Sequence, residues 1–338
     1  MTVIAKVLEG RTILVTACGG DIGLGIGKIL RETLPHSLLV GCDVQDDHGG
    51  QFIFNHCDKI ARADAPTYLE ELIALVKHRQ ADLVIPTSEA EITAISSMER
   101  KAGSAPLIVM ASREAVAVGL DKLTTARFLS SQGLTPPWTV DADTESPLAF
   151  PCILKPRAGR GSRGIIKIED AAMAAFWSCR SSRCVWQEYL RPDNEEYTCG
   201  VFRSRQGVIR TIVLRRTLAR GLTGKGEVID NVNIDSILIR IANSLKLVGS
   251  INVQLRLTAD GPRVFEINPR FSSTVVFRHL LGFQDLIWSI QDVLAIPCES
   301  YTPPPPGSRF YRGSLEHIAF HKQKPSPMGG EPQFRDTF

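Results

Sequence analysis

The run VFEINPRFSST, which spans residues 264–274, places polar side chains at the end of an apolar strand. Side chains in a strand repeat every two residues, so Glu266 and Asn268 lie on one face. Pro269 and Arg270 follow at once, and the arginine adds a cation beside the two oxygen donors. Oxygen donors next to a cation suit a metal–phosphate site, whereas the same residues taken alone are also typical of a solvated strand end.

A second strand-like run, GSINVQL, precedes the first along the chain and carries Gln254. If the two runs pair as a hairpin, Gln254, Glu266 and Asn268 face one another. Carboxylate and amide oxygens, completed by phosphate and water, are ligands that suit Mg²⁺. The two runs together therefore predict a magnesium site.

Lys155 ends another predicted strand and is followed by the glycine-rich loop RAGRGSRG, residues 157–164. Gly159, Gly161 and Gly164 allow backbone amides to approach phosphate oxygens, and Lys155 adds a point charge beside them. A solvated hairpin tip is the alternative interpretation of this loop.

The run VWQEYL, residues 185–190, ends a further strand at Glu188. A carboxylate in this position could bind a ribose while neighbouring backbone groups bind an adenine. The alternative is an ordinary exit from strand to loop.

Basic residues crowd the segment 203–225, including Arg215, Arg216 and Lys225. They could form a cationic wall for an anionic acceptor. Exposed strand edges protected by charge are the alternative, because native sheets often use this device.

Two groups of elements must position these side chains. Apolar runs at 12–17, 37–44, 83–85 and 106–110 alternate with helical patterns, which predicts a parallel sheet with helices on both faces. After residue 120 the predicted elements are mainly strands joined by short links, which is typical of an α+β arrangement.

Composition narrows the function classes. The chain has 338 residues, 43% of them hydrophobic and 22% charged, which is ordinary for a globular protein of two to three domains. The net charge of +3 is too small to indicate nucleic acid binding, and no apolar stretch is long enough to span a membrane. The eight cysteines, Cys18 and Cys57 among them, form no C-x-x-C pairs, so we interpret them as free thiols in a reducing cytoplasm rather than as a disulfide framework or a zinc site.

The glycine turn at residues 19–27 offers a competing nucleotide site. It lacks the G-x-G-x-x-G fingerprint and is closer to the turn of short-chain dehydrogenases. No tyrosine has a lysine four residues later, as that family would require. We therefore expect these glycines to serve helix packing, and an NAD(P)-dependent oxidoreductase remains a less favoured alternative.

The order of the motifs resembles the ATP-grasp superfamily. The series runs from Asp121-Lys122 through LKP with its glycine-rich loop, QEYL, EEY and INVQ to FEINPR. It is similar to one carboxyphosphate-forming half of the carbamoyl-phosphate synthetase large subunit. The resemblance covers about residues 12–300 and includes a preceding α/β domain.

The resemblance implies a domain plan and a fold class, an α/β N-terminal parallel-sheet domain followed by a two-lobed α+β ATP-grasp fold. The expected parts are a pre-ATP-grasp domain over 1–115, a small lobe with the glycine-rich loop over 116–185, a large lobe with the metal site over 186–300, and a proline-rich linker and tail over 301–338.

It also implies a role for each matched residue. Lys122, Lys155 and the loop glycine Gly161 would contact ATP phosphates. Glu188 and Leu190 would lie at the adenine and ribose, and Glu196 would lie near the ribose or Lys155. Gln254, Glu266 and Asn268 would hold Mg²⁺, with two ions expected and Mn²⁺ able to substitute. Arg270 would face the transferred phosphate and is the expected catalytic residue.

The expected activity is that of an ATP-dependent carboxylate–amine ligase acting through an acyl-phosphate in the cytoplasm. Small-molecule carboxylates and amines are the expected partners, without nucleic acid or membrane, and a homodimer is left open. The chain is too short for a complete carbamoyl-phosphate synthetase, and its loop is unusually rich in arginine. A non-catalytic nucleotide-binding regulator is the main alternative.

Overall fold

The structure, a computed structural model, describes residues 2–98, 106–159 and 164–313. Its contacts divide the chain into two compact units. The first unit holds the described residues within 1–87 and 100–108, and the second holds those within 88–99 and 109–313.

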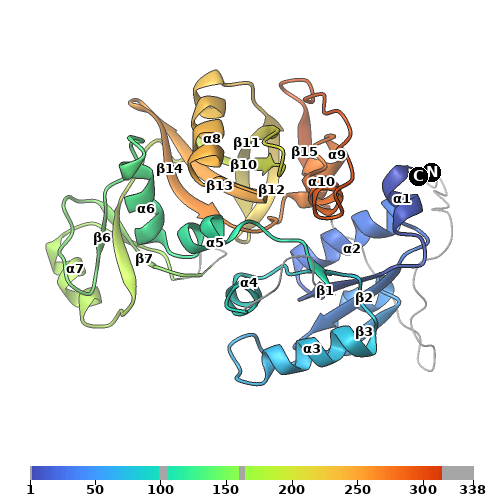
Figure 1. Ribbon diagram of the computed structural model, residues 1–338. Coiled ribbons are helices and arrows are strands. Elements are labelled where there is room, and N and C mark those ends of the chain that lie inside the picture. The colour runs from blue at the N-terminus through green and yellow to red at the C-terminus, as the bar shows by residue number, and fades with distance from the viewer. Residues whose placement is uncertain (1, 99–105, 160–163, 314–338) are drawn as a thin grey trace, which may run out of the picture. The chain divides into compact units, whose positions relative to one another are not determined.

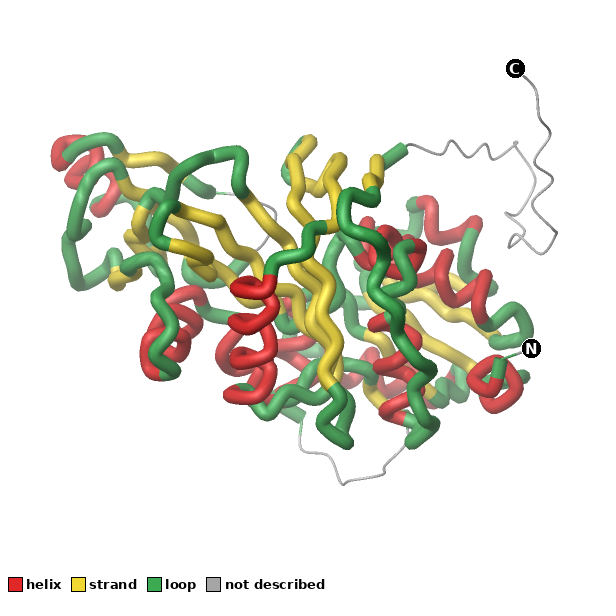
Figure 2. Tube along the Cα trace, turned by 90° about the horizontal axis from the view of Figure 1, so that it is seen from above, coloured by secondary structure: helices red, strands yellow, loops and turns green. Residues whose placement is uncertain are grey.

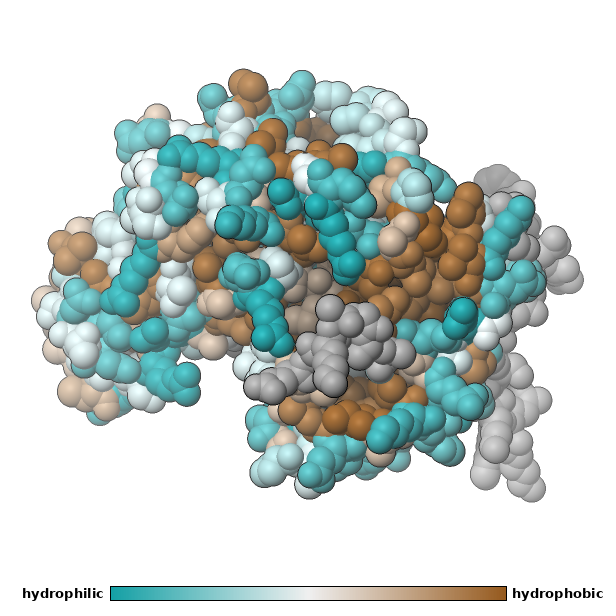
Figure 3. All heavy atoms as spheres, in the orientation of Figure 1, coloured by the Kyte–Doolittle hydropathy of each residue, from teal (hydrophilic) through white to brown (hydrophobic). Residues whose placement is uncertain are grey.

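The first unit is a five-stranded parallel sheet in the order β3-β2-β1-β4-β5. Figure 1 shows α2 and α3 on opposite faces of this sheet, as the alternation of strands and helices predicts. The visible face of this unit carries hydrophilic and hydrophobic residues side by side (Figure 3), while Tyr68 and Leu72 of α3 are buried. Its elements are α1 Val3–Val7, β1 Thr12–Thr16, α2 Asp21–Thr33, β2 Leu38–Asp43, the 3-10 helix η1 Gly49–Phe52, β3 His56–Lys59, α3 Tyr68–His78, β4 Leu83–Ile85 and β5 Leu107–Ile108.

The second unit contains a small antiparallel sheet in the order β6-β9-β7-β8, which packs on α7. The helices α4 Glu89–Ser96, α5 Arg113–Gly119 and α6 Lys122–Ser131 precede it along the chain. The sheet and its helix comprise β6 Thr139–Asp141, β7 Cys152–Pro156, β8 Ile166–Ile168, α7 Ala171–Ser178 and β9 Cys184–Glu188.

A six-stranded antiparallel sheet in the order β14-β13-β10-β11-β12-β15 forms the rest of the second unit. The chain path through these strands and helices can be followed in Figure 2. The elements are β10 Glu196–Arg203, β11 Ile209–Ala219, β12 Leu222–Val228, α8 Val232–Ser244, β13 Gly249–Thr258, β14 Gly261–Asn268, α9 Val275–Leu280, α10 Asp285–Val293 and β15 Arg309–Tyr311.

Alternating side chains of the six-stranded sheet supply two cores. Cys199 and Val201 of β10 pack with residues of α8, whereas Phe202 of the same strand packs with Phe283 and Trp288. Both faces of the sheet are therefore partly covered, which holds the strands that carry the polar motifs in fixed register.

The predicted fold class is confirmed, and two local features differ from the predicted plan. Residues 88–98 belong with the second unit, because Glu89 at the start of α4 pairs with Arg270. Within the predicted linker, Arg309–Tyr311 forms β15 and pairs with β12. Phe310 explains this pairing, since its buried ring joins the core below the sheet.

Among the residues that the structure describes, no helix combines the length and the apolar character that crossing a membrane would require.

Candidate active site

The two polar runs pair as an antiparallel hairpin. Gln254 of β13 lies opposite Glu266 of β14, and Asn252 lies opposite Asn268. The three predicted metal ligands thus share one region of the sheet, at the end of β14. Their carboxylate and amide oxygens have the chemistry that Mg²⁺ prefers.

A bulge in β14 shapes this region. Leu255 pairs with Val264 while Gln254 pairs with Glu266, so Phe265 is the extra residue. Val264 and Ile267 both enter the core on the α8 side, although three positions separate them. The bulge instead places Phe265 near the ammonium of Lys155, whose Nζ lies 5.4 Å from the ring centroid. Bulges often lie beside active sites, where they redirect a side chain.

Two lysines from the small-lobe segment face the hairpin. Lys122 Nζ lies 3.5 Å from Glu266 Oε1 and donates to Gly159 O at 3.0 Å. Lys155 at the end of β7 is only 4% exposed. Burial lowers the pKa of Lys155 to about 8, and Lys122 contributes in the same direction while Glu266 opposes the shift. The two ammonium groups and Glu266 therefore form one coupled cluster.

Local structure explains the position of Lys122. It is the first residue of α6, and Asp121 caps that helix by accepting from Thr124 N at 2.9 Å. Arg157 at the base of the glycine-rich loop donates to Asp121 Oδ2 at 2.8 Å and to Asp141 Oδ2 at 2.9 Å. The helix start and the loop base are thereby joined.

The glycine-rich loop is described only at its ends. Gly159 and Gly164 both adopt positive φ values, +120° and +70°, which favour glycine. Gly161, the predicted phosphate contact, lies outside the described residues.

Glu196 at the start of β10 is held by two arginines. Arg216 Nη2 donates to Glu196 Oε1 at 2.6 Å, and Arg256 Nη2 donates to Oε2 at 2.9 Å. Arg216 Nη2 also donates to Gln254 Oε1 at 3.1 Å. One guanidinium thus connects two predicted site residues, and Arg256 is a member of this network that the motif pattern does not identify.

Glu188 is the junction between the small sheet and the hairpin. Its Oε2 accepts from Arg263 Nη2 at 2.7 Å and from Trp138 N at 3.1 Å. Leu190, two residues after Glu188, is buried. Its backbone carbonyl accepts a hydrogen bond from Arg256 Nη1 at 2.9 Å. Arg256 and Arg263 both belong to the β13–β14 hairpin. Through them, Glu188 and Leu190 of the predicted adenine segment are held against this hairpin.

Arg270 lies directly after the metal-ligand run. Its Nε and Nη2 donate to Glu89 Oε1 at 3.2 and 3.0 Å, and Nη2 also lies 3.4 Å from Asn268 Oδ1. Asn268 is 3% exposed, and its Nδ2 has no hydrogen-bond partner among the described residues. A buried polar group of this kind is costly unless something else satisfies it, which agrees with a site meant for a ligand.

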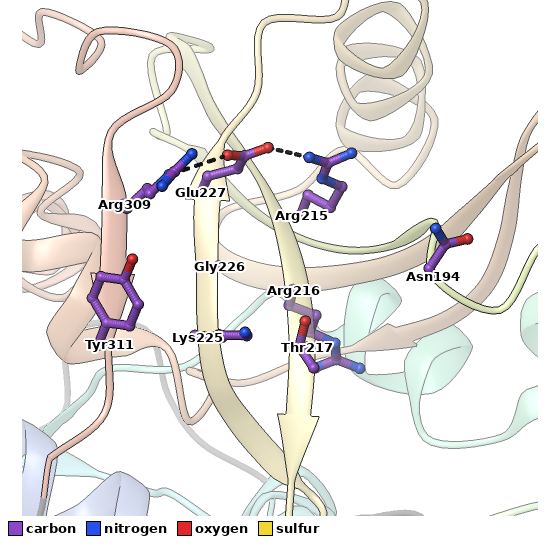
Figure 4. A pocket seen from close by; sticks show the side chains of 9 residues that line it. All are labelled: Asn194, Arg215, Arg216, Thr217, Lys225, Gly226, Glu227, Arg309 and Tyr311. Carbon is purple, nitrogen blue, oxygen red and sulfur yellow. Dashed lines mark hydrogen bonds and ion pairs between the residues drawn. The ribbon is translucent and has the colours of Figure 1, made fainter.

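A polar pocket of about 380 Å³ lies on the strands β11, β12 and β15 (Figure 4). Arg215, which lies between Glu195 and Glu227, and Arg309, which is 3.8 Å from Glu227, are both engaged by acids. The backbone of Lys225 pairs with β11 and β15, whereas its ammonium has no hydrogen bond or ion pair among the described residues. The lining residues are Asn194, Arg215, Arg216, Thr217, Lys225, Gly226, Glu227, Arg309 and Tyr311.

Six of the seven basic residues in the segment 203–225 therefore fall into two groups. Arg203, Arg205 and Arg210 contact Leu247 O, Asp292 and Glu299 O, and these contacts are structural. Arg215, Arg216 and Lys225 line the pocket. Sequence alone cannot make this division, because it depends on the pairing of β11 with β12.

The glycine turn of the first unit is closely packed. A Cβ on Gly23 would lie 2.3 Å from Ala17 O, and one on Gly27 would lie 2.7 Å from the side chains of Ile53 and Phe54. Gly19 N donates to Asp43 Oδ2 at 3.0 Å. Close packing accounts for glycine at both positions, in agreement with the prediction for this turn.

Comparison with known proteins gives a family match over part of the chain. Residues 181–310 match the model of a family described as "ATP-grasp in the biosynthetic pathway with Ter operon". A formate-dependent phosphoribosylglycinamide formyltransferase from Mycolicibacterium gilvum is 27% identical over 196 residues, which covers 54% of this chain and 47% of that protein. The chain thus spans about half the length of this curated relative.

Solved structures show the same fold. An N5-carboxyaminoimidazole ribonucleotide synthetase in complex with ADP has a TM-score of 0.71 at 16% identity, covering 88% of this chain and 81% of that one. The biotin carboxylase of Campylobacter jejuni has a TM-score of 0.67 at 17% identity, covering 87% and 73%. The L-amino acid ligase of Bacillus licheniformis has a TM-score of 0.65 at 14% identity, covering 84% and 74%. The likeness to carbamoyl-phosphate synthetase fits loosely, since these matches are to other proteins of this fold.

Proposed function

We propose that this chain, whose fold matches that of ATP-grasp enzymes, is an ATP-dependent carboxylate–amine ligase of that superfamily. A carboxylate oxygen attacks the γ-phosphorus of ATP, the bond to ADP breaks, and an acyl-phosphate forms. An amine then attacks the acyl carbon, a carbon–nitrogen bond forms, and phosphate leaves. The observation that carries the proposal is the pairing of Gln254 with Glu266, in register with Asn268 and facing Lys122.

The site residues have distinct roles in this reaction. Gln254, Glu266 and Asn268 fit Mg²⁺, which would supply positive charge to the triphosphate. Lys122 and Lys155 provide fixed cations for the phosphates, and Arg270, positioned by Glu89, faces the transferred phosphoryl group. No side-chain nucleophile is needed, because the substrate carboxylate attacks. Two Mg²⁺ ions and replacement by Mn²⁺ stay predictions.

The adenine and ribose lie at the segment around Glu188 and Leu190. Arg263 and Arg256 hold that segment against the hairpin of β13 and β14. This contact sets the distance between the base end and the phosphate end of the site. Glu196 forms ion pairs with Arg216 and Arg256, and in this proposal it orients their guanidinium groups.

The polar pocket on β11, β12 and β15 supports a proposal for the substrate class. A pocket of about 380 Å³ suits a small molecule. Arg216 contacts Gln254 and also lines this pocket, so it connects the pocket to the phosphate site. Lys225 and the hydroxyl of Tyr311 suit an anionic substrate that carries polar groups besides the reacting carboxylate. The proposal places the enzyme in the cytoplasm, and a homodimer stays a prediction.

The test is ADP and phosphate release from Mg·ATP across a panel of amino acids, small carboxylates and sugar acids, each with and without an amine. The proposal expects release that requires both a carboxylate and an amine. ATP binding without release under any pairing would favour the non-catalytic regulator.

Lys225→Gln tests the substrate class once a carboxylate is found. We expect the KM for the carboxylate to rise by about tenfold, which corresponds to the loss of one charge-assisted contact of about 1.4 kcal/mol. The affinity for ATP should stay unchanged. Arg205→Gln is the matched control, because Arg205 belongs to the same basic segment but pairs with Asp292 outside the pocket. Equal effects of the two variants would refute the assignment of the pocket.

A further inference from the structure

Three metal-ligating side chains meet in the first unit, apart from the ATP site. Cys18 follows β1, His48 lies in the loop after β2, and Cys57 lies in β3. Their sulfur atoms and one imidazole nitrogen all lie within 4.8 Å of one another. Cys18 Sγ is 3.7 Å from His48 Nε2. Tetrahedral zinc sites bring thiolate and imidazole ligands together at this scale, since Zn–S and Zn–N bonds are about 2.3 and 2.0 Å long.

The middle strand of the sheet leaves room for the two sulfurs. Gly41 in β2 pairs with Val15 of β1 on one side and with Cys57 of β3 on the other. A Cβ on Gly41 would lie 2.6 Å from Cys18 Sγ, so the sulfur occupies the space that a side chain would fill. Cys18 therefore reaches across β2 toward Cys57.

The backbone holds Cys18 beside β2, because Cys18 N donates to Cys42 O at 3.1 Å. Cys57 pairs with Gly41 from the other side of β2. The two thiols therefore approach each other across the middle strand, where one cation can bind both sulfurs.

The imidazole of His48 is held in place before any ion binds. Its Nδ1 accepts from Gly50 N at 3.1 Å. The ring packs where side chains on Gly19 or Gly50 would lie, since an added Cβ would meet it at 2.7 and 2.8 Å. This packing directs Nε2 toward the sulfur of Cys18.

We propose that Cys18, His48 and Cys57 bind one thiophilic divalent cation, Zn²⁺, with water as the fourth ligand. Cys57 and His48 are only half-buried, which leaves an open side for that water. Binding at Nε2 moves the ring proton to Nδ1, so the Gly50 amide loses its acceptor and changes its contact. The ion joins the three strands β1, β2 and β3 through the segments that carry its ligands. No short sequence motif marks this site, because its three ligands come from separate segments of the chain.

The experiment uses the full chain, reduced and freed of metal, and titrates it with Co²⁺ as a spectroscopic substitute for Zn²⁺. We expect thiolate-to-cobalt charge-transfer bands and tetrahedral ligand-field bands that saturate at one ion per chain, and a shift of the Gly50 amide resonance. Zn²⁺ should displace Co²⁺ and raise the thermal unfolding midpoint. Mg·ATP turnover does not enter the readout.

Variants separate this site from other thiols. Cys57→Ser and His48→Asn should each weaken binding by at least about 100-fold, since loss of a ligand exceeds the effect of losing an outer partner. Asn keeps an acceptor near Gly50 N, so folding is preserved while Nε2 is removed. Cys179→Ser, which removes an exposed thiol elsewhere, should bind as the unaltered chain does.

Two results would overturn the proposal. One is the absence of thiolate–cobalt bands, or bands that persist unchanged in Cys57→Ser. The other is a Cys18–Cys57 disulfide found by mass spectrometry in the chain purified without reductant.

Discussion

Glu266 is the residue on which the proposed chemistry depends most. It pairs with Gln254 across the hairpin and lies 3.5 Å from the ammonium of Lys122. Glu266→Gln keeps the size of the side chain and removes its charge. We expect turnover to fall by at least about 100-fold, or about 2.7 kcal/mol of barrier, because the charge balance at the phosphates is lost.

The control for this variant is Glu169→Gln, which removes a carboxylate that is more than half exposed and pairs with Lys167. The thermal unfolding of both variants should resemble that of the unaltered chain. Near-normal turnover of Glu266→Gln would remove the basis of the metal assignment.

Lys155 makes ATP affinity depend on pH. Burial lowers its pKa to about 8 from 10.5, so the free protein loses this charge as pH rises through about 8. We expect ATP affinity to fall above that pH, because a neutral amine no longer attracts phosphate. Lys155→Arg keeps its charge at every accessible pH, so its affinity should be flatter across this range, although its shape fits less well. Calorimetric titration of ATP at several pH values measures both.

The same shift has a consequence for stability. The unfolded chain binds the Lys155 proton up to a pKa near 10.5, whereas the folded chain releases it near 8. The unfolded state therefore holds more protons between these values, and this residue makes the free energy of unfolding rise with pH there. The comparison is with Lys155→Met, which cannot titrate. If the free energy of unfolding of the unaltered chain fell with pH relative to that variant, Lys155 would not have a lowered pKa in the folded chain.

At the scale of elements, the end of β7 and the end of β9 should respond together to nucleotide. Arg157 connects the loop base to α6, and Glu188 connects β9 to the hairpin through Arg263. We predict added protection from amide hydrogen exchange at residues 155–159 and 186–191 when Mg²⁺ and a non-hydrolysable ATP analogue bind. The glycine turn at 18–27 should change little.

The reverse pattern of protection would place the nucleotide in the first unit. It would revive the dehydrogenase-like interpretation of the glycine turn and leave Glu266 and Asn268 without a role.

The alternation rule predicts most of the hairpin but misses its bulge. Glu266 and Asn268 were expected on one face, and the register of β13 with β14 agrees with that expectation. Phe265 lies within β14 beside Val264, but it is the extra residue at the bulge and lies near Lys155. One inserted residue leaves no mark in the order of polar and apolar letters, so sequence alone could not place it.

Contacts between distant segments are also beyond the motif pattern. Arg256 and Arg263 have no motif of their own, and they matter because strand pairing brings them to Glu196 and Glu188. Strand β15 is short and follows a run of prolines, so its residues read as linker. The three ligands of the proposed zinc site are likewise brought together only by the pairing of β1, β2 and β3.

At the scale of the whole molecule, the sequence predicts the architecture well because two signals are strong. Alternation of strands and helices over the first part of the chain predicts a parallel sheet, and the ordered motifs predict an ATP-grasp arrangement after it. The structure and its neighbours confirm both. The proposed substrate pocket is a different matter, because it is assembled from β11, β12 and β15 and its lining comes together only after folding.

The central claim is that a carboxylate of the substrate attacks ATP. It is tested most directly with the carboxylate found in the release screen, labelled with ¹⁸O in both oxygens and supplied with its amine and Mg·ATP. Attack by the carboxylate transfers one of its oxygens to phosphorus, so mass spectrometry should find one ¹⁸O atom in each phosphate released during product formation. Phosphate that forms alongside product but carries no ¹⁸O would contradict the acyl-phosphate mechanism.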